Sequence, residues 1–111
     1  MATTENLVPK GADRLMCVKI GKEKRENLYE MTRKYWRADM KRARLATHVL
    51  AIKDGIVIGV FHADKWVYTD NPQYEGRLEF IGKEDPASDY VGKSVASFYG
   101  QSQNPVKYIN M

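Results

Sequence analysis

Basic and aromatic side chains alternate in one stretch of this sequence, a combination typical of sites that contact nucleotides. Arginine and lysine attract phosphate groups, and aromatic rings stack on unpaired bases. Arg33 and Arg37 are four residues apart with Trp36 beside them, and Arg44 follows seven residues after Arg37. On a helix these steps place the three arginines within about 60° of one another. We therefore expect Arg33 and Arg37 to hold a phosphate whose base lies within reach of Trp36.

Two later segments add candidate contacts for a base or an anion. Trp66 follows Lys65 at the end of a predicted hairpin. The Gly92-Lys93-Ser94 turn would offer backbone N–H groups and the Lys93 ammonium to an anion, although it lacks the upstream glycine of a phosphate-binding loop. The alternative for Lys93 is an ordinary tight turn, and the alternative for the tryptophans is a place in a small core.

Catalytic signatures are absent from the sequence. It contains no phosphate-binding loop, nucleophile elbow, zinc-protease helix or dinucleotide fingerprint. Residues 64–89 hold enough carboxylates for a metal-dependent nuclease, but neither Glu75 nor Glu79 is followed two residues later by lysine. His48 and His62 have no serine or cysteine nucleophile at a recognisable spacing, so we assign them hydrogen-bonding roles. We predict no catalytic residue, metal or cofactor, and keep an enzyme as the less favoured interpretation.

The positive charge of the chain is concentrated around the same arginines. The net charge is +4, and residues 22–44 alone hold nine cations against four carboxylates. The rest of the chain is therefore close to neutral. A basic segment of this kind favours a partner that bears phosphates, through its local potential and the release of counterions. The alternative is a solvated helix face on which cations and glutamates pair at i,i+4 spacing.

Length and composition limit the class of protein. A chain of 111 residues, 43% hydrophobic and 29% charged, is typical of one globular domain. A single cysteine excludes an internal disulfide, and with two histidines it is too few for an ordinary zinc site. No apolar run approaches the roughly 18 residues of a membrane span. The first ten residues lack the apolar core of a secretory signal, so we expect a cytoplasmic protein that does not contact membranes.

Hydrophobic periodicity and turn residues predict the elements that position these side chains. We expect a disordered tail over residues 1–12 and a single domain over residues 13–111. A strand at 16–20 precedes a helix at 23–36, a bend at 37–38 and a helical turn capped by Asp39. Asp54-Gly55 predicts a type I′ hairpin with a returning strand at 56–63. A short strand at 78–81 ends at Gly82, residues 91–98 are ambiguous, and a last strand follows Pro105.

The order of these elements predicts the fold class. Turns are close together and leave few residues for crossover helices. We therefore predict an α+β fold in which a small curled mixed or antiparallel sheet, or a partly open barrel, carries one helical layer.

A set of short motifs is spread over residues 28–110. They are Tyr29-Glu-Met-Thr-Arg33, Tyr35-Trp36-Arg37, Asp54-Gly55-Ile56-Val57-Ile58-Gly59-Val60-Phe61, Tyr90-Val91-Gly92-Lys93-Ser94-Val95 and Gln103-Asn104-Pro105-Val106. Together they resemble an uncharacterised bacterial and phage domain associated with GIY-YIG type nucleases and with defence neighbourhoods. The resemblance implies an accessory module, because the nuclease motif itself is missing from this sequence.

The Gly-Val-Phe strand with a tryptophan after it is also similar to the PUA-like group of nucleic-acid and modified-base readers. This similarity implies a PUA-like barrel in which Trp36, Trp66 and the Gln103-Asn104 turn border a pocket that reads the edge of a base. The ligand-binding residues expected from the sequence are Arg33, Trp36, Arg37, Arg44, Trp66, Lys93, Gln103 and Asn104.

These observations predict a non-catalytic module that binds nucleic acid or a nucleotide through a basic helix and an aromatic-lined cleft. The alternative is a phage or bacterial protein–protein module that inhibits or recruits a partner enzyme, with its basic face on an acidic surface. A steep salt dependence shared by many sequences would favour nucleic acid, and indifference to nucleotides would favour a protein partner. DNA, RNA and free nucleotide stay open as ligands here, as does the oligomeric state.

Overall fold

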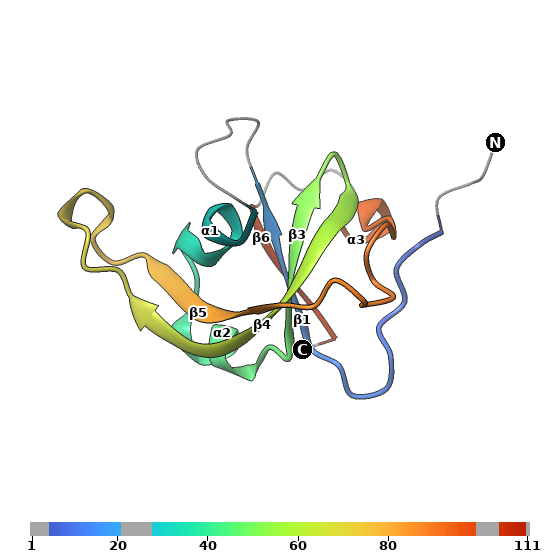
Figure 1. Cartoon of the computed structure of the whole chain (residues 1–111), viewed down its shortest axis with the longest axis horizontal. Coiled ribbons are helices and arrows are strands. Elements are labelled where there is room, and N and C mark those ends of the chain that lie inside the picture. The colour runs from blue at the N-terminus through green and yellow to red at the C-terminus, as the bar shows by residue number, and fades with distance from the viewer. Residues whose placement is uncertain (1–4, 21–27, 100–104, 111) are drawn as a thin grey trace.

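A mixed six-stranded sheet forms the centre of this computed structural model, which describes residues 5–20, 28–99 and 105–110 (Figure 1). The spatial order of the strands is β2-β5-β4-β3-β1-β6. β1 and β3 are parallel, and the other neighbouring pairs are antiparallel. Over the described ranges the end strands do not pair with each other, so the sheet is open. The strands are β1 (Leu15–Lys19), β2 (Lys34–Trp36), β3 (His48–Lys53), β4 (Ile56–Tyr68), β5 (Leu78–Glu84) and β6 (Val106–Ile109).

Three short α-helices and one 3₁₀ turn complete the described part of the chain. They are α1 (Leu28–Arg33), α2 (Met40–Leu45), η1 (Pro72–Tyr74) and α3 (Ala96–Tyr99). The fold is therefore α+β, with one mixed sheet and small helices, as the sequence predicts. None of these helices has the length and apolar character that crossing a membrane requires.

Both faces of the central strands are buried, because successive side chains of a strand point to opposite faces. Leu15 and Cys17 of β1 belong to one core, which Tyr99 of α3 covers. Met16 and Val18 belong to the other core, which also contains Ala43 of α2 and packs against α1. We call these the α3-side core and the α1–α2 core. β1 is a continuous apolar run because it lies at the middle of this two-sided packing.

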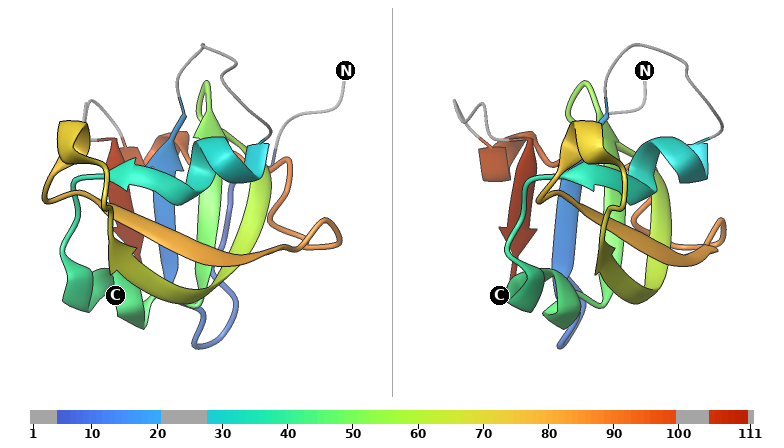
Figure 2. Two further views of the ribbon diagram at one scale, coloured as in Figure 1. Left: turned by 60° about the vertical axis from the view of Figure 1, so that its left-hand side comes forward. Right: turned by 90° about the vertical axis from the view of Figure 1, so that its left-hand side faces the viewer.

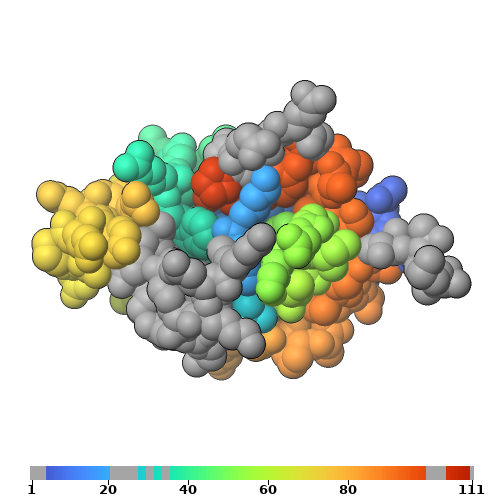
Figure 3. All heavy atoms as spheres, turned by 90° about the horizontal axis from the view of Figure 1, so that it is seen from above, coloured from blue at the N-terminus to red at the C-terminus, as the bar shows by residue number. Residues whose placement is uncertain are grey.

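The β3–β4 hairpin confirms the type I′ turn. Asp54 has φ +52° and Gly55 has φ +79°, the left-handed conformation that this turn needs at both central residues. The hairpin tip lies against the segment before α3, where the N–H of Val95 donates to the carbonyl of Gly55 at 2.8 Å (Figure 3). The Asp39 cap is also confirmed, since its side chain accepts from the N–H of Lys41 at 3.0 Å. The last strand, β6, follows Pro105 as expected.

The prediction of one long basic helix over 23–36 is wrong for its C-terminal part. Residues 21–27 lie outside the described residues, α1 ends at Arg33, and β2 pairs with β5. Tyr35 and Trp36 are aromatic residues that favour strands, and the pairing of Trp36 with Leu78 at the sheet edge outweighs their helical spacing. The helical face that was to align Arg33 with Arg37 therefore does not exist.

The strands β4 and β5 are longer than their patterns suggest. β4 runs to Tyr68, so Trp66 lies inside a strand and not after one. β5 continues through Gly82, where an added Cβ would stand 2.0 Å from the carbonyl oxygen of His62. Glycine is needed there for close approach of the backbones, and it does not end the strand. A register shift between Ala63 and Lys65 accompanies the strong curvature of this pair (Figure 2).

The segment before β1 packs against the α3-side core. The sequence assigns residues 1–12 to a tail, but the structure buries the Leu7 side chain within this core. The N–H of Leu7 donates to the carbonyl of Ser94 at 2.8 Å, and the N–H of Lys10 donates to the Tyr90 hydroxyl at 2.9 Å. Residues 5–12 therefore contact the domain along the loop that precedes α3.

Candidate ligand-binding site

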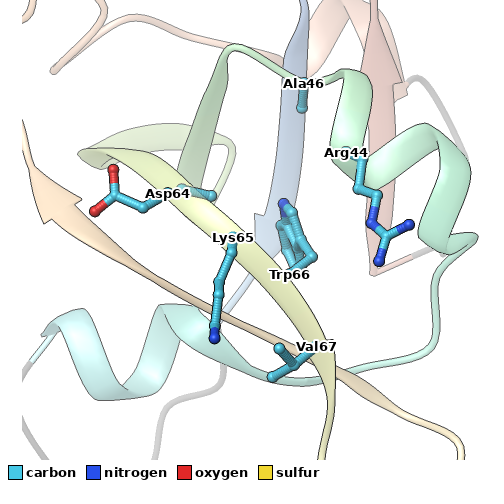
Figure 4. Close-up of a pocket in the computed structure, with 7 residues that line it drawn as sticks. Arg44, Ala46, Asp64, Lys65, Trp66 and Val67 are labelled. Carbon is cyan, nitrogen blue, oxygen red and sulfur yellow. The ribbon is translucent and has the colours of Figure 1, made fainter.

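A pocket of about 450 Å³ lies between α2 and β4 (Figure 4). Its volume falls in the range of sites that hold small molecules. The pocket is bounded on one side by the end of α2 and on the other by the C-terminal half of β4. Its lining residues are Arg44, Ala46, Ala63, Asp64, Lys65, Trp66 and Val67.

Arg44 and Trp66 bring side-chain nitrogen atoms to one side of this pocket. Figure 4 shows the Arg44 guanidinium on the same side of β4 as the Trp66 indole, whereas the charged ends of Asp64 and Lys65 point away from both. Arg44 is exposed, and its guanidinium forms no hydrogen bond or salt bridge with any residue that the structure describes. It is therefore available to an anion.

Trp66 is a core residue whose indole N–H has no acceptor. Its side chain is only 5% exposed, and its ring packs on Phe80 with a centroid distance of 5.1 Å. The ring consequently has no free face on which a base could stack. Nε1 is buried and has no hydrogen-bond partner among the described residues. A buried donor left unpaired costs about 1–3 kcal/mol, so an acceptor that reached Nε1 would gain this interaction.

The indole N–H of Trp36, unlike that of Trp66, has a hydrogen-bond acceptor within the chain. It is partly buried and packs against the α1–α2 core. Its Nε1 donates to the carbonyl oxygen of Thr32 at 2.7 Å. Trp36 therefore closes the junction between α1 and β2 and does not line the pocket that contains Trp66.

Arg33 and Arg37, expected to form a phosphate clamp, have different surroundings. Arg33 Nε donates to the carbonyl of Phe80 at 3.0 Å, and its Nη1 lies 3.9 Å from Oε2 of Glu79. Its guanidinium also lies 5.7 Å from the ring centre of Tyr29. Arg33 thus joins α1 to β5 and is mostly buried, whereas Arg37 lies beyond β2 and is exposed.

The Lys93 ammonium has a carboxylate partner. It donates to Glu5 Oε2 at 2.6 Å, and this hydrogen bond and charge lower the pKa of Glu5. Lys93 therefore links the loop before α3 to the N-terminal segment. Gln103 and Asn104 lie outside the described residues, so the structure does not place the amide turn.

Exposed cations gather on α2 and the segment before it. Asp39 is the one carboxylate of residues 37–45, and it caps the helix. Arg42 lies over the Tyr108 ring at 4.1 Å from the ring centre. We call these four cations the α2 basic surface: Arg37, Lys41, Arg42 and Arg44.

A second polar cluster, which the sequence did not predict, surrounds His48 and His62. Their ring centres lie 4.6 Å apart. His62 Nδ1 faces the carbonyl of Thr47 at 3.3 Å, and Nε2 faces Asp85 Oδ2 at 3.1 Å. His48 Nδ1 lies 2.7 Å from Thr47 Oγ1. Thr47 Oγ1 also lies 3.0 Å from the carbonyl oxygen of Arg14, so its one proton serves either that carbonyl or His48 Nδ1, according to the tautomer of the imidazole.

Asp13 and Tyr90 complete the histidine cluster. His48 Nε2 lies 3.9 Å from Asp13 Oδ2, and the Tyr90 hydroxyl donates to the same oxygen at 2.7 Å. Burial lowers the pKa of His48. The Asp13 carboxylate raises this pKa, and the His62 ring lowers it further. All four ring nitrogens face protein groups, so the cluster ties the N-terminal segment to the sheet. Over the described ranges, no group of three or more His, Cys, Asp or Glu side chains is arranged to hold a metal.

Comparison with known proteins adds no assignment to this geometry. No family model, no curated protein and no solved structure matches the chain. The resemblance to the accessory domain of GIY-YIG type nucleases therefore stays a prediction from the motifs.

Proposed function

We propose that this protein is a non-catalytic module that binds nucleic acid through the α2 basic surface. The proposal is carried by one observation: Arg37, Lys41 and Arg44 are exposed and form no salt bridge with any described residue. Cations that close together in the sequence, without carboxylate partners among the described residues, raise the local potential and favour a phosphate-bearing partner. A solvated face stabilised by i,i+4 ion pairs would require acidic neighbours, and the only one in this segment caps the helix.

The shape of the sheet supports a second part of the proposal. We propose that the curled sheet is a partly open, PUA-like barrel and that the chain acts as an accessory module. β4 is 13 residues long and has a register shift against each of its neighbours. Such bulges increase the twist of a strand and curl a sheet toward closure.

Salt-dependent binding tests this function. We expect labelled mixed-sequence oligonucleotides to bind with an affinity that falls steeply between about 50 mM and about 200 mM salt. The Arg37→Ala/Arg44→Ala double variant should bind at least about tenfold more weakly, and its salt dependence should be shallower because fewer counterions are released. Fluorescence anisotropy measures both quantities.

A matched variant distinguishes the contribution of the α2 basic surface to binding from that of the overall net charge. Lys53→Ala/Lys83→Ala removes two exposed cations outside the α2 basic surface and should keep most of the affinity. Equal losses in the two double variants would show that binding reflects overall charge alone. If the parent protein binds no oligonucleotide at low salt, the proposed function is wrong.

A further inference from the structure

The indole N–H of Trp66 is not part of the α2 basic surface, and the function proposed above assigns it no role. It is a buried donor at the wall of the pocket, without an acceptor among the described residues. Figure 4 shows its nitrogen on the edge of the ring nearer to Ala46. The Trp36 indole, by contrast, donates to the carbonyl of Thr32, and the hydroxyls of Tyr99 and Tyr108 share with Trp66 the lack of a partner among the described residues. Of these three groups, Trp66 is the one that lines the pocket, so an acceptor on a ligand would satisfy its N–H.

The pocket combines this donor with a cation. The Arg44 guanidinium and the Trp66 N–H are both hydrogen-bond donors, and the carboxylate of Asp64 points away from them. A ligand for this pair must therefore carry acceptor oxygens and negative charge. The volume of about 450 Å³ admits more than a bare phosphate ion. A phosphate attached to a sugar and base meets both conditions.

An exposed aromatic ring lies on the same side of β4. Tyr68 follows Trp66 by two residues, so the two side chains share a face of the strand at a spacing of about 7 Å. Tyr68 is 63% exposed, although its cross-strand partner Leu78 is fully buried. A large ring in this position offers a stacking surface to a base.

From these observations we infer that the pocket takes one nucleotide of a single-stranded nucleic acid. Its phosphate pairs with Arg44, an acceptor oxygen meets the Trp66 N–H, and a neighbouring base stacks on Tyr68. In a duplex, bases are paired and stacked, so they cannot reach the pocket or the ring. The inference rests on the proposed function and restricts it to single strands.

The two tryptophans allow a direct test in the whole protein. In ¹⁵N-labelled protein the indole N–H resonances are observed separately, and Trp66→Phe assigns them. The probes are a single-stranded oligouridylate, its duplex with oligoadenylate, uridine monophosphate and inorganic phosphate. We expect the Trp66 resonance to shift with the single strand and with uridine monophosphate, and to stay in place with the duplex and with phosphate. The Trp36 resonance should not move, because its N–H is already bonded within the chain.

Binding by variants provides an independent readout. Tyr68→Ala should weaken oligouridylate binding by about fivefold or more. Tyr74→Ala, which removes a tyrosine that lies against Arg77, should have little effect. Trp66→Phe should weaken binding by about fivefold. Trp66 is a core residue. If Trp66→Phe does not fold, Tyr68→Ala still tests the inference, because Tyr68 is exposed.

The outcomes distinguish this inference from the function on which it rests. If oligouridylate binds in a salt-dependent manner while the Trp66 resonance stays fixed, the pocket inference is overturned and the α2 basic surface stands. If inorganic phosphate shifts the resonance as far as the mononucleotide does, the pocket holds a phosphate ion only and the inference again fails. If no oligonucleotide binds, both are wrong.

Discussion

At His48, burial and charge act on the same imidazole in opposite directions. Burial lowers its pKa, Asp13 partly opposes this, and His62 reinforces it. An unfolded histidine titrates near pH 6.5, so on acidification the unfolded state takes up its proton before the folded state does. We predict that the urea midpoint falls as the pH is lowered from about 7.5 to about 5.5, and that His48→Gln removes part of this fall. A His48→Gln variant that keeps the full pH dependence of the parent would contradict the assignment.

Single residues also show how far a sequence pattern can predict a site. Arg44 was expected to contact a ligand and lies exposed at a pocket. Arg33 matches it in type and in helical spacing, yet donates to the carbonyl of Phe80 and is mostly buried. The difference depends on which strand packs beside each arginine. The residues of that strand are distant in the sequence, so the spacing around an arginine does not reveal the contact. The same holds for Trp66, whose unpaired N–H becomes visible only when the packing around it is known.

At the scale of elements, the β3–β4 turn is the most direct test of local chemistry. Gly55 has φ +79°, and the nearest atom to an added Cβ would be that of Ala96 at 3.9 Å. Space is therefore available, and conformational strain alone opposes a side chain. We predict that Gly55→Val lowers the free energy of unfolding by about 1–3 kcal/mol, measured by chemical denaturation. Asp54→Gly should change it little, because glycine accepts the same conformation. An unchanged midpoint for Gly55→Val would show that the turn adds nothing to stability.

The same hairpin shows why element patterns could not reveal the histidine cluster. A two-residue turn at Asp54-Gly55 pairs Lys53 with Ile56, and an unbroken ladder would then place His48 opposite Phe61. A register shift between Ala51 and Ile52 moves the pairing by one residue, so that Val49 faces Phe61 and the two histidines meet. The turn is encoded locally and was predicted. The bulge depends on packing across both faces of the sheet and was not.

For the whole molecule, the N-terminal segment tests where the domain begins. Leu7 is 2% exposed and belongs to the α3-side core, while its neighbour Val8 is 72% exposed. We predict that Leu7→Ala lowers the free energy of unfolding by about 2–5 kcal/mol. Val8→Ala should change it by less than about 0.5 kcal/mol. Urea denaturation compares the two variants, and equal effects would show that this segment does not pack in solution.

The position of β1 between β3 and β6 has a consequence for the rate at which the chain folds. β1 pairs with β3 across about thirty residues, and it pairs Leu15 with Ile109, nearly the whole chain away. Contacts between such distant segments require loops to close before any stabilisation is gained, which slows folding. During synthesis, β1 emerges first of the described strands and its partner β6 emerges last. Until then one edge of β1 is unpaired, and an unpaired strand edge is a surface on which newly made chains associate.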